Sequence, residues 1–284
     1  MSVAQFFVRS RKFVLVITGV GIFGFSESAI ARVARRIVFS AIRLAAKSRR
    51  CHLIFENASD QATIGLKSVA ASRTTILMGA GVDPDEFPAS DLPETPPFRL
   101  ATVSRLVWSK GVDLAARAVS TLTQQGHEVT LDIYGLPDQA NPRPIDPTSF
   151  SDLPGVRYHG FTGEIAEIWK FHHAGIFPSR GGEGLPRALL EASMCGRPSI
   201  VSNVPGCVDF IREGIDGYVV PADSEEELRK AILKLSASRD ELLLLGKNAR
   251  QRVLATSTTK AIQAEYEAIF RSVSASKANM QTAA

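Results

Sequence analysis

The stretch "AGIFPSRGGEGLPRALLEASMCGRPSIVS", residues 174–202, carries the pattern that decides the fold. An apolar run ending at Phe177 leads into three closely spaced glycines, then a helical pattern from Pro186 and a second apolar run, "PSIVS". Proline is well tolerated as the first residue of a helix, where its missing N–H costs no hydrogen bond. A strand, a glycine loop, a helix and another strand in this order predict one unit of a parallel sheet.

The same alternation extends on both sides of this stretch. Strands are expected at 13–18, 52–55, 74–78, 98–104, 129–135 and 156–160, and helices at 26–47, from 58, and at 112–125, 164–173, 224–236, 240–254 and 258–273. Alternating strands and helices predict an α/β fold in which helices cover both faces of a Rossmann-like parallel sheet. In such sheets ligands bind beyond the carboxyl ends of the strands.

A proline-rich segment divides the chain. "GAGVDPDEFPASDLPETPPF", residues 79–98, has five prolines and five acidic residues, which is typical of a surface linker. We therefore expect a partial N-terminal domain at 1–93 and a second, larger domain at 94–256. A C-terminal helix at 257–273 is expected to pack back toward the N-terminal part, and residues 274–284 are expected to form a disordered tail.

The overall composition excludes few classes of function. The chain has 284 residues, 45% hydrophobic and 22% charged, with a formal charge of +4 and a pI near 9.0. These values are ordinary for a globular protein and weakly favour acidic partners such as phosphates, anionic lipids or nucleic acid. Three cysteines without metal-ligand spacing indicate a reducing compartment. The motifs HExxH, CxxC and GxxxxGK[ST] are missing from the sequence, so neither a zinc site nor a P-loop is predicted.

The N-terminal apolar run has two interpretations. Arg9, Arg11 and Lys12 precede an apolar segment at 13–25 and small residues follow it, as in a secretory signal peptide. Because Gly19, and further glycines after it, interrupt the run, we favour a buried strand, "FVLVIT", that leads into a glycine turn. No stretch reaches the roughly 20 apolar residues that a transmembrane helix needs.

The helix expected at 26–47 is amphipathic and basic. Apolar residues are expected on its core side and cations on the other: Ile30, Val33, Ile37, Ala41 and Leu44 against Arg32, Arg36, Arg43, Lys47 and Arg50. This pattern suits a helix packed on the core with a solvated basic face. It also suits peripheral docking on an anionic membrane, and both interpretations stay open.

Two acidic residues in the opening stretch are candidates for binding a polyhydroxylated ligand. Glu183 lies in the glycine loop and Glu191 in the following helix. Each carboxylate could accept hydrogen bonds from sugar hydroxyls, at about 1.5–3 kcal/mol per bond to a charged group. Alternatively, Glu183 is a charge at a helix N-terminus and Glu191 pairs with Arg187, four residues earlier.

A pair of cations follows another strand. "VSRLVWSKG" places Arg105 and Lys110 in the loop after Ser104. Two cations at the end of a strand could neutralise a diphosphate and stabilise it as a leaving group.

Together these segments resemble the retaining GT-B glycosyltransferases that carry the "glycosyl transferases group 1" domain. The resemblance covers about residues 13–273 and rests on segments that follow in order: "GAGVDPDEF" at 79–87, "SRLVWSKGVD" at 104–113, "VRYHGFTGEIAEIW" at 156–169, "PSRGGEGLPRALLEASMCGRPSIVSNVPGCVDFI" at 178–211 and "REGIDGYVVPADSEEEL" at 212–228. It implies a GT-B fold, with a nucleotide-sugar donor domain and an N-terminal acceptor domain.

The resemblance also implies roles for individual residues. Arg105 and Lys110 match the cations on the donor diphosphate, Glu183 the acid at the donor sugar, and Glu191 the acid at the ribose. The remaining donor-binding positions are Gly182, Gly184 and Leu185 beside the phosphate and Gly160 and Phe161 at the nucleobase.

The implied reaction is transfer of a hexosyl-type sugar, with retention, from a nucleotide sugar to a hydroxyl acceptor in cell-surface polysaccharide or glycolipid biosynthesis. The acceptor would be a sugar or a lipid-linked molecule. No cofactor, essential metal or nucleic-acid partner is expected, and the location would be cytoplasmic, with possible contact to the inner membrane face. One alternative is a non-catalytic or partner-dependent nucleotide-sugar binder. Another is a metal-dependent GT-A transferase using Asp83 and Asp85, which the linker position of these residues disfavours.

The sequence departs from the family pattern in two ways. Only about 90 residues precede the linker, and the Gly-rich acceptor loop and the histidine near the reacting carbon have no counterpart; His52 is the only histidine there. Three residues, at 180–182, separate "PS" from Glu183 where two are usual. We therefore expect a complete donor domain with half an acceptor domain, as a truncated gene product, a misassigned start codon or completion by a partner would produce.

Overall fold

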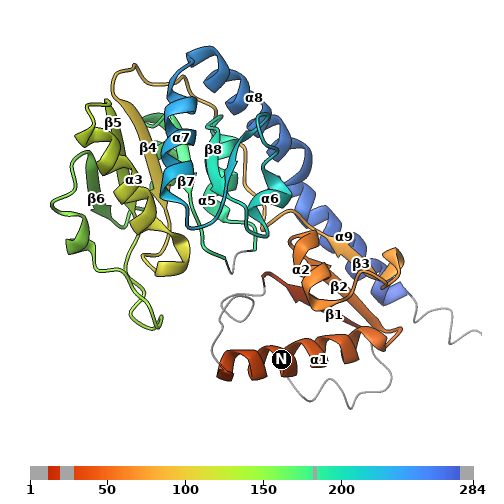
Figure 1. Cartoon of the computed structure of the whole chain (residues 1–284). Coiled ribbons are helices and arrows are strands. Elements are labelled where there is room, and N and C mark those ends of the chain that lie inside the picture. Colours follow the sequence, from red (N-terminus) through yellow and green to blue (C-terminus); the bar gives the residue numbers. More distant parts are fainter. Residues whose placement is uncertain (1–11, 20–28, 182–183, 276–284) are drawn as a thin grey trace, which may run out of the picture.

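A computed structural model describes residues 12–19, 29–181 and 184–275. Across these residues the strands form two parallel sheets, one of three strands before the proline-rich segment and one of six strands after it. Figure 1 shows the sheets as two separate bodies of the molecule, with the C-terminal helix crossing from the larger to the smaller. The expected α/β architecture with parallel sheets is confirmed.

The smaller sheet has the strand order β1-β2-β3. Its strands are β1 (Phe13–Ile17), β2 (Cys51–Phe55) and β3 (Thr74–Ile76), connected by α1 (Ala29–Lys47), α2 (Ala58–Ile64) and a short 3-10 turn, η3 (Ala71–Arg73). The strand expected at the N-terminal apolar run is present, since β1 pairs in parallel with β2 from Phe13 opposite Cys51 onward. The glycine turn expected after it falls largely outside the described residues.

The larger sheet has the order β6-β5-β4-β7-β8-β9. Its strands are β4 (Phe98–Val103), β5 (Val129–Tyr134), β6 (Val156–Gly160), β7 (Ala174–Phe177), β8 (Ser199–Ser202) and β9 (Gly217–Val220). The strand order reverses between β4 and β7, and loops that leave neighbouring strands diverge at such a point and open a crevice. The loops after β4 and β7 are the ones that carry the predicted site.

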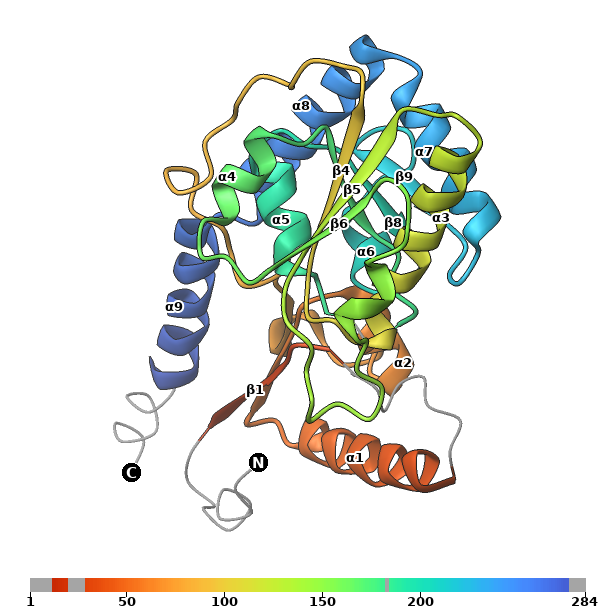
Figure 2. The ribbon, with the colours of Figure 1, turned by 90° about the vertical axis from the view of Figure 1, so that its left-hand side faces the viewer.

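Helices cover both faces of the larger sheet, as Figure 2 shows. The helices of the larger domain are α3 (Val112–Gln124), α4 (Ile165–Lys170), α5 (Arg187–Met194), α6 (Cys207–Phe210), α7 (Glu225–Ser236) and α8 (Arg239–Thr256), with 3-10 turns η4 (Trp108–Lys110) and η5 (Pro147–Phe150). The last helix, α9 (Thr259–Ala275), packs on the smaller sheet instead. Ser224 and Ser238 cap α7 and α8 by accepting hydrogen bonds from backbone N–H groups three residues on. Serine at these positions satisfies donors that a helix start leaves unpaired.

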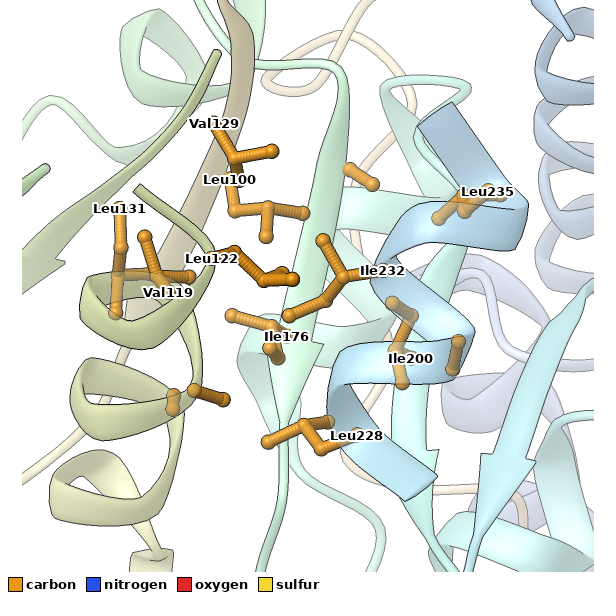
Figure 3. Packing of buried hydrophobic residues seen from close by; sticks show 14 of the residues in the cluster. Leu100, Val119, Leu122, Val129, Leu131, Ile176, Ile200, Leu228, Ile232 and Leu235 are labelled. Atoms are coloured by element: carbon orange, nitrogen blue, oxygen red, sulfur yellow. The ribbon is translucent and has the colours of Figure 1, made fainter. Parts of the chain in front are cut away.

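The core of the larger domain lies between the sheet and the helices α3 and α7. Figure 3 shows Leu122 of α3 and Ile232 of α7 meeting Ile176 of β7 in this layer. A second buried cluster under α5 and α6 covers the opposite face, around Leu189 and Phe210. Because helices bury both faces of the larger sheet, the sequences of its strands are continuous apolar runs.

The C-terminal helix α9 packs on the smaller sheet. Ile262 and Ile269 form a buried cluster with Ile54 of β2 and Leu77. The chain thus passes from the smaller sheet to the larger and returns to the smaller. α9 continues to Ala275, which is two residues into the tail expected from 274, and residues 276–284 lie outside the described part. In the described helices, none is long and apolar enough to cross a membrane.

The predicted core side of α1 is wrong. Ile30 and Ile37 are 84% and 65% exposed, and Val33 and Leu44 are exposed too. The helix is buried instead through Phe39, Ile42, Ala45 and Ala46. The small alanine side chains let α1 lie close to the sheet. The side of α1 that carries them is therefore buried, and the side with the larger aliphatic residues is exposed. α1 therefore has three sectors: one buried, one basic, and one apolar and exposed.

Candidate active site

A pocket of about 270 Å³ lies at the carboxyl ends of β4 and β7. Its lining includes Ser104, Arg105, Lys110, Ser179, Arg187 and Glu191. The two predicted cations and one of the two predicted acids therefore share one cavity, although they lie up to 86 residues apart in the chain. The two cations and Glu191 lie close together because β4 and β7 are neighbouring strands in the sheet.

Arg105 is anchored by the neighbouring strand's loop. Its guanidinium donates to Oδ2 of Asp138, which follows β5, at 2.6 Å, while its side chain stays 66% exposed. An exposed ion pair of this kind contributes little to stability, typically below about 1 kcal/mol. Arg105 can therefore exchange the carboxylate for a bound phosphate at small cost.

Lys110 ends the short turn η4, and a glycine determines where that turn lies. Gly111 has a positive φ of 68°, and a Cβ placed on it would lie 2.0 Å from the carbonyl oxygen of Pro178. No other residue type fits such a contact without displacing the backbone. Gly111 thus brings the Lys110 turn directly against the end of β7, where the glycine loop begins.

Arg180 holds the same turn from the opposite side. Its Nη1 donates to the carbonyl oxygen of Trp108 at 2.7 Å, and its own N–H donates to the carbonyl oxygen of Ser109 at 2.8 Å. The guanidinium also pairs with Asp113 through two nitrogens and with Asp223 through Nε. Burial opposes ionisation of Asp113, but hydrogen bonds from Arg180 and Arg117 outweigh it and lower its pKa.

Sequence reasoning missed this role of Arg180. The available signal was its position as one of the three residues that separate "PS" from Glu183, where two are usual. Its contacts with Trp108 and Ser109 join the loop after β4 to the loop after β7. Its contacts with Asp113 and Asp223 extend to α3 and to the loop after β9. The side chain is nearly buried, so it positions the pocket wall from behind.

Glu191 forms part of the wall on the α5 side. Its side chain is buried, and Nε of Arg187 donates to its Oε1 at 2.8 Å. Burial raises the pKa of Glu191, while the contact with Arg187 opposes the shift. Glu191 and Arg187 also line an adjoining hollow formed by Glu86, Phe87 and residues 163–167. The ion pair expected as the structural alternative exists, and it borders both cavities.

The glycine loop is described only in part. Glu183 and Gly182 lie outside the described residues, whereas Gly184 and Leu185 lie within them. A Cβ on Gly184 would lie 2.1 Å from the carbonyl oxygen of Thr18 and 2.3 Å from Oε2 of Glu56. Glycine is therefore required here by close contact with the ends of β1 and β2. The smaller sheet reaches the donor-side loop at this point.

Gly160 and Phe161 lie at the end of β6, away from this pocket. The N–H of Gly135 donates to the carbonyl oxygen of Gly160 at 2.7 Å, and Phe161 is 74% exposed. In the described residues neither one lines the cavity that holds Arg105 and Lys110. Their assignment to the nucleobase stays a prediction.

A polar cluster around the buried Asp132 lies in the larger sheet. Asp132 of β5 contacts Nε2 of His159 at 2.6 Å and Nε2 of His172 at 2.9 Å. Burial opposes ionisation of Asp132, but its contacts with both histidines lower its pKa. His172 lies just after α4, and its partner Asp132 lies on a strand 40 residues earlier in the chain. The described residues contain no group of three or more His, Cys, Asp or Glu side chains arranged for a metal ion.

The described fold is a Rossmann-like parallel sheet with a pocket where β4 and β7 end. Residues 97–238, which are 142 of the 284 residues, match the family model "Glycosyl transferases group 1". The chain belongs to this family. The resemblance stated from the sequence is thereby confirmed.

Two curated relatives and two solved structures place the chain more closely. It is 30% identical over 152 residues to the Campylobacter jejuni N,N'-diacetylbacillosaminyl-diphospho-undecaprenol alpha-1,3-N-acetylgalactosaminyltransferase, covering 54% of this chain and 39% of the relative. It is 30% identical over 167 residues to the Erwinia amylovora amylovoran biosynthesis glycosyltransferase AmsK, covering 55% and 40%. The chain thus spans about two fifths of the length of these two relatives.

The structural neighbours show the GT-B fold. Anabaena Alr3699/HepE in complex with UDP and glucose matches with a TM-score of 0.73 and 17% identity, over 92% of this chain and 72% of that one. Sucrose-phosphate synthase from Thermosynechococcus elongatus matches with a TM-score of 0.77 and 21% identity, over 93% and 68%. The matched regions, 92% and 93% of this chain, take in both sheets.

Proposed function

We propose that this chain binds a nucleotide-sugar donor in the pocket at β4 and β7 and transfers the sugar to a hydroxyl acceptor. The observation that carries the proposal is the convergence of Arg105, Lys110 and Glu191 on one cavity beside the glycine loop. Family membership supports the same reaction class. We infer a hexosyl-type sugar and retention of configuration, as the family resemblance implies.

The residues have complementary tasks in this proposal. Arg105 and Lys110 neutralise the donor diphosphate and stabilise the nucleoside diphosphate as it leaves, which are the tasks that metal-dependent enzymes give to a cation. For that reason the proposal includes no essential metal. Glu191 accepts hydrogen bonds from the ribose hydroxyls and Glu183 from the donor sugar. The wall between the two cavities, formed by Glu191 and Arg187, would then lie alongside the nucleoside.

The relatives support a lipid-linked or polysaccharide acceptor. The Campylobacter relative is named for transfer to a diphospho-undecaprenol-linked sugar, and the Erwinia relative for amylovoran biosynthesis. We therefore propose a role in cell-surface polysaccharide or glycolipid biosynthesis, at the cytoplasmic side of the membrane.

A turnover assay tests the proposal. The chain is incubated with UDP-glucose, UDP-N-acetylglucosamine and GDP-mannose, and release of the nucleoside diphosphate is followed with and without saccharide acceptors. We expect turnover of at least one donor, and a loss of about tenfold to a thousandfold in the Glu183→Ala variant if it holds the donor sugar in the transition state. Exposed Glu267→Ala on α9 is the matched control.

Two other outcomes would change the conclusion. Donor binding without turnover, even with acceptor present, would make the chain a non-catalytic or partner-dependent nucleotide-sugar binder. Turnover abolished by EDTA and restored by a divalent cation would reject the metal-independent mechanism.

We also propose that α1 docks on an anionic membrane surface. The helix carries five cations and no acid between Ala29 and Lys47. Its exposed apolar sector, Ile30, Val33, Ile37 and Leu44, lies beside the basic sector of Arg32, Arg36 and Arg43. A protein interface usually excludes charge from its centre, whereas anionic lipid accepts both sectors together. In Figures 1 and 2 α1 forms one outer border of the molecule.

Vesicle co-sedimentation tests this docking surface. We expect the chain to bind vesicles that contain phosphatidylglycerol and to stay in solution with pure phosphatidylcholine. Replacing Arg32 and Arg36 by serine is expected to weaken binding about tenfold or more, at about 1 kcal/mol per cation. The double variant Leu243→Ser/Leu244→Ser, on an exposed part of α8, is the control. Equal binding to both vesicle types would contradict the proposal, as would self-association through α1 in sedimentation experiments.

A further inference from the structure

Glu56 links the smaller sheet to the donor-side loop. It directly follows β2 and precedes Asn57, the residue that caps α2. The backbone N–H of Leu185, beyond the glycine loop, donates a hydrogen bond to its carboxylate. A carboxyl group from the acceptor-side sheet thus contacts the loop that carries Glu183.

The contact is tightly packed. Oε2 of Glu56 lies 2.3 Å from where a Cβ on Gly184 would be, and the carbonyl oxygen of Thr18 lies 2.1 Å from the same point. Nearby, the N–H of Ser59 in α2 donates to Oδ2 of Asp209 in α6 at 3.3 Å. Two contacts between the domains therefore hold the end of the smaller sheet on the loops of the larger one.

The Leu185 N–H lies where an anionic ligand would be favoured. It precedes α5, and the N–H groups at the start of a helix attract anions because they lack helical partners and carry the positive end of the helix dipole. The family resemblance assigns the backbone at Gly184 and Leu185 to the donor phosphate. In this structure the carboxylate of Glu56 accepts the hydrogen bond from that N–H.

We propose that Glu56 competes with the donor diphosphate for the Leu185 N–H and so sets donor affinity from the acceptor-side domain. This inference rests on the proposed function. Without donor, the Glu56 carboxylate accepts the hydrogen bond from the Leu185 N–H and so links the two domains. The donor must displace the carboxylate, which turns away from Leu185. Glu56 is therefore a positioning residue that acts through the loop and takes no part in the bond-breaking step.

The ionisation of Glu56 makes the competition dependent on pH. Burial raises the pKa of Glu56 to about 7, the Leu185 N–H opposes this shift, and the charge of Asp60 adds to it. The titratable groups that face it are Asp60 in α2 and Tyr266 in α9, while Asp209 lies on the adjoining α6. Below pH 7 the carboxyl group is neutral and repels the diphosphate little. Above pH 7 it is an anion, so donor affinity falls as the pH rises.

Calorimetric titration with a nucleotide sugar tests the inference. UDP-glucose is a suitable probe because both phosphates are esterified and do not titrate near neutral pH. We expect the wild-type affinity to fall about tenfold between pH 6 and pH 8, since one added repulsion of about 1.4 kcal/mol corresponds to a factor of ten. Glu56→Gln keeps the acceptor oxygen and loses the charge, so its affinity should change less than about twofold and exceed that of wild type at pH 8.

The outcomes separate this inference from the proposed function. If the wild type binds none of UDP-glucose, UDP-N-acetylglucosamine and GDP-mannose at pH 6, the proposed function is rejected and the inference with it. If a donor binds and Glu56→Gln shows the same pH profile as wild type, the inference alone is rejected. Glu267→Gln serves as the matched control, and thermal unfolding at each pH shows whether the variants are folded.

Discussion

Replacing Lys110 by alanine is expected to lower kcat of sugar transfer by about two to three orders of magnitude, the usual effect of removing one preorganised group that stabilises developing charge. The negative charge on the leaving diphosphate grows as the glycosidic bond breaks, so an ammonium group nearby stabilises the transition state more than the ground state. Gly111 and Arg180 hold the Lys110 turn from two sides, which preorganises it.

Arg105→Ala is expected to cost less, about tenfold, because its guanidinium is largely exposed and shared with Asp138. Steady-state kinetics should therefore rank Lys110→Ala well below Arg105→Ala in kcat. Lys247→Ala, a lysine of α8 outside the pocket, is the matched control. An unchanged kcat in a correctly folded Lys110→Ala protein would remove this lysine from the mechanism.

Arg197→Met is expected to lower the free energy of unfolding by about 3–5 kcal/mol. Arg197 is 1% exposed and bonds the proline-rich segment to the larger domain. It donates to the carbonyl oxygens of Trp169, Ser90 and Asp91 at 2.6–2.9 Å and to the hydroxyl of Ser90 at 2.6 Å. Methionine fills much of the volume and leaves these acceptors without donors, each at about 1–3 kcal/mol.

Burial lowers the pKa of Arg197 to about 10, so the guanidinium stays charged at neutral pH. Equilibrium unfolding in urea measures the change, with Arg271→Met as control because that side chain is 76% exposed. A loss below about 1 kcal/mol for Arg197→Met would show that the segment keeps its place without this arginine. Because the two sheets have separate buried clusters, unfolding can show a second transition, so two spectroscopic probes should be compared.

The larger domain was predicted from the sequence almost element by element. The expected strand at 98–104 is β4, ending at Val103, and the expected helix at 112–125 is α3, ending at Gln124. Long apolar runs separated by glycine and proline identify strands buried on both faces, because few other local patterns suit that environment. Strand β9 at 217–220 and the short helix α6 at 207–210 were not predicted. The predicted elements differ from the observed ones at their ends, where caps and turns decide the last residue.

α1 shows where local pattern fails. Its sequence has two apolar sectors, one of large aliphatic side chains and one of alanines with Phe39 and Ile42, and hydrophobicity alone favours the first. The sheet selects the second, because small residues let the helix axis come close to β2. The hydrophobic periodicity of a helix sequence indicates which faces of the helix are apolar. It does not indicate which of these faces another element covers.

For the candidate site too, the sequence predicted some features and only the structure showed others. The residue types and their positions after strands were visible in the sequence: Arg105 and Lys110 after one strand, Glu183 and Glu191 after another. The convergence of Arg105, Lys110 and Glu191 depends on β4 and β7 being neighbours, which no local pattern specifies. Asp132 with its two histidines, and Arg180 with Asp113 and Asp223, were not found, because each partner comes from a different element.

By itself the sequence determined the elements, their parallel arrangement and the kinds of side chain at the strand ends, since hydrophobic period and turn residues act over a few neighbours. Tertiary structure alone decided which strand ends meet, which side of α1 is buried, and that Glu56 reaches Leu185 across the two domains. These depend on contacts between residues far apart in the chain, and such contacts form only when whole elements pack.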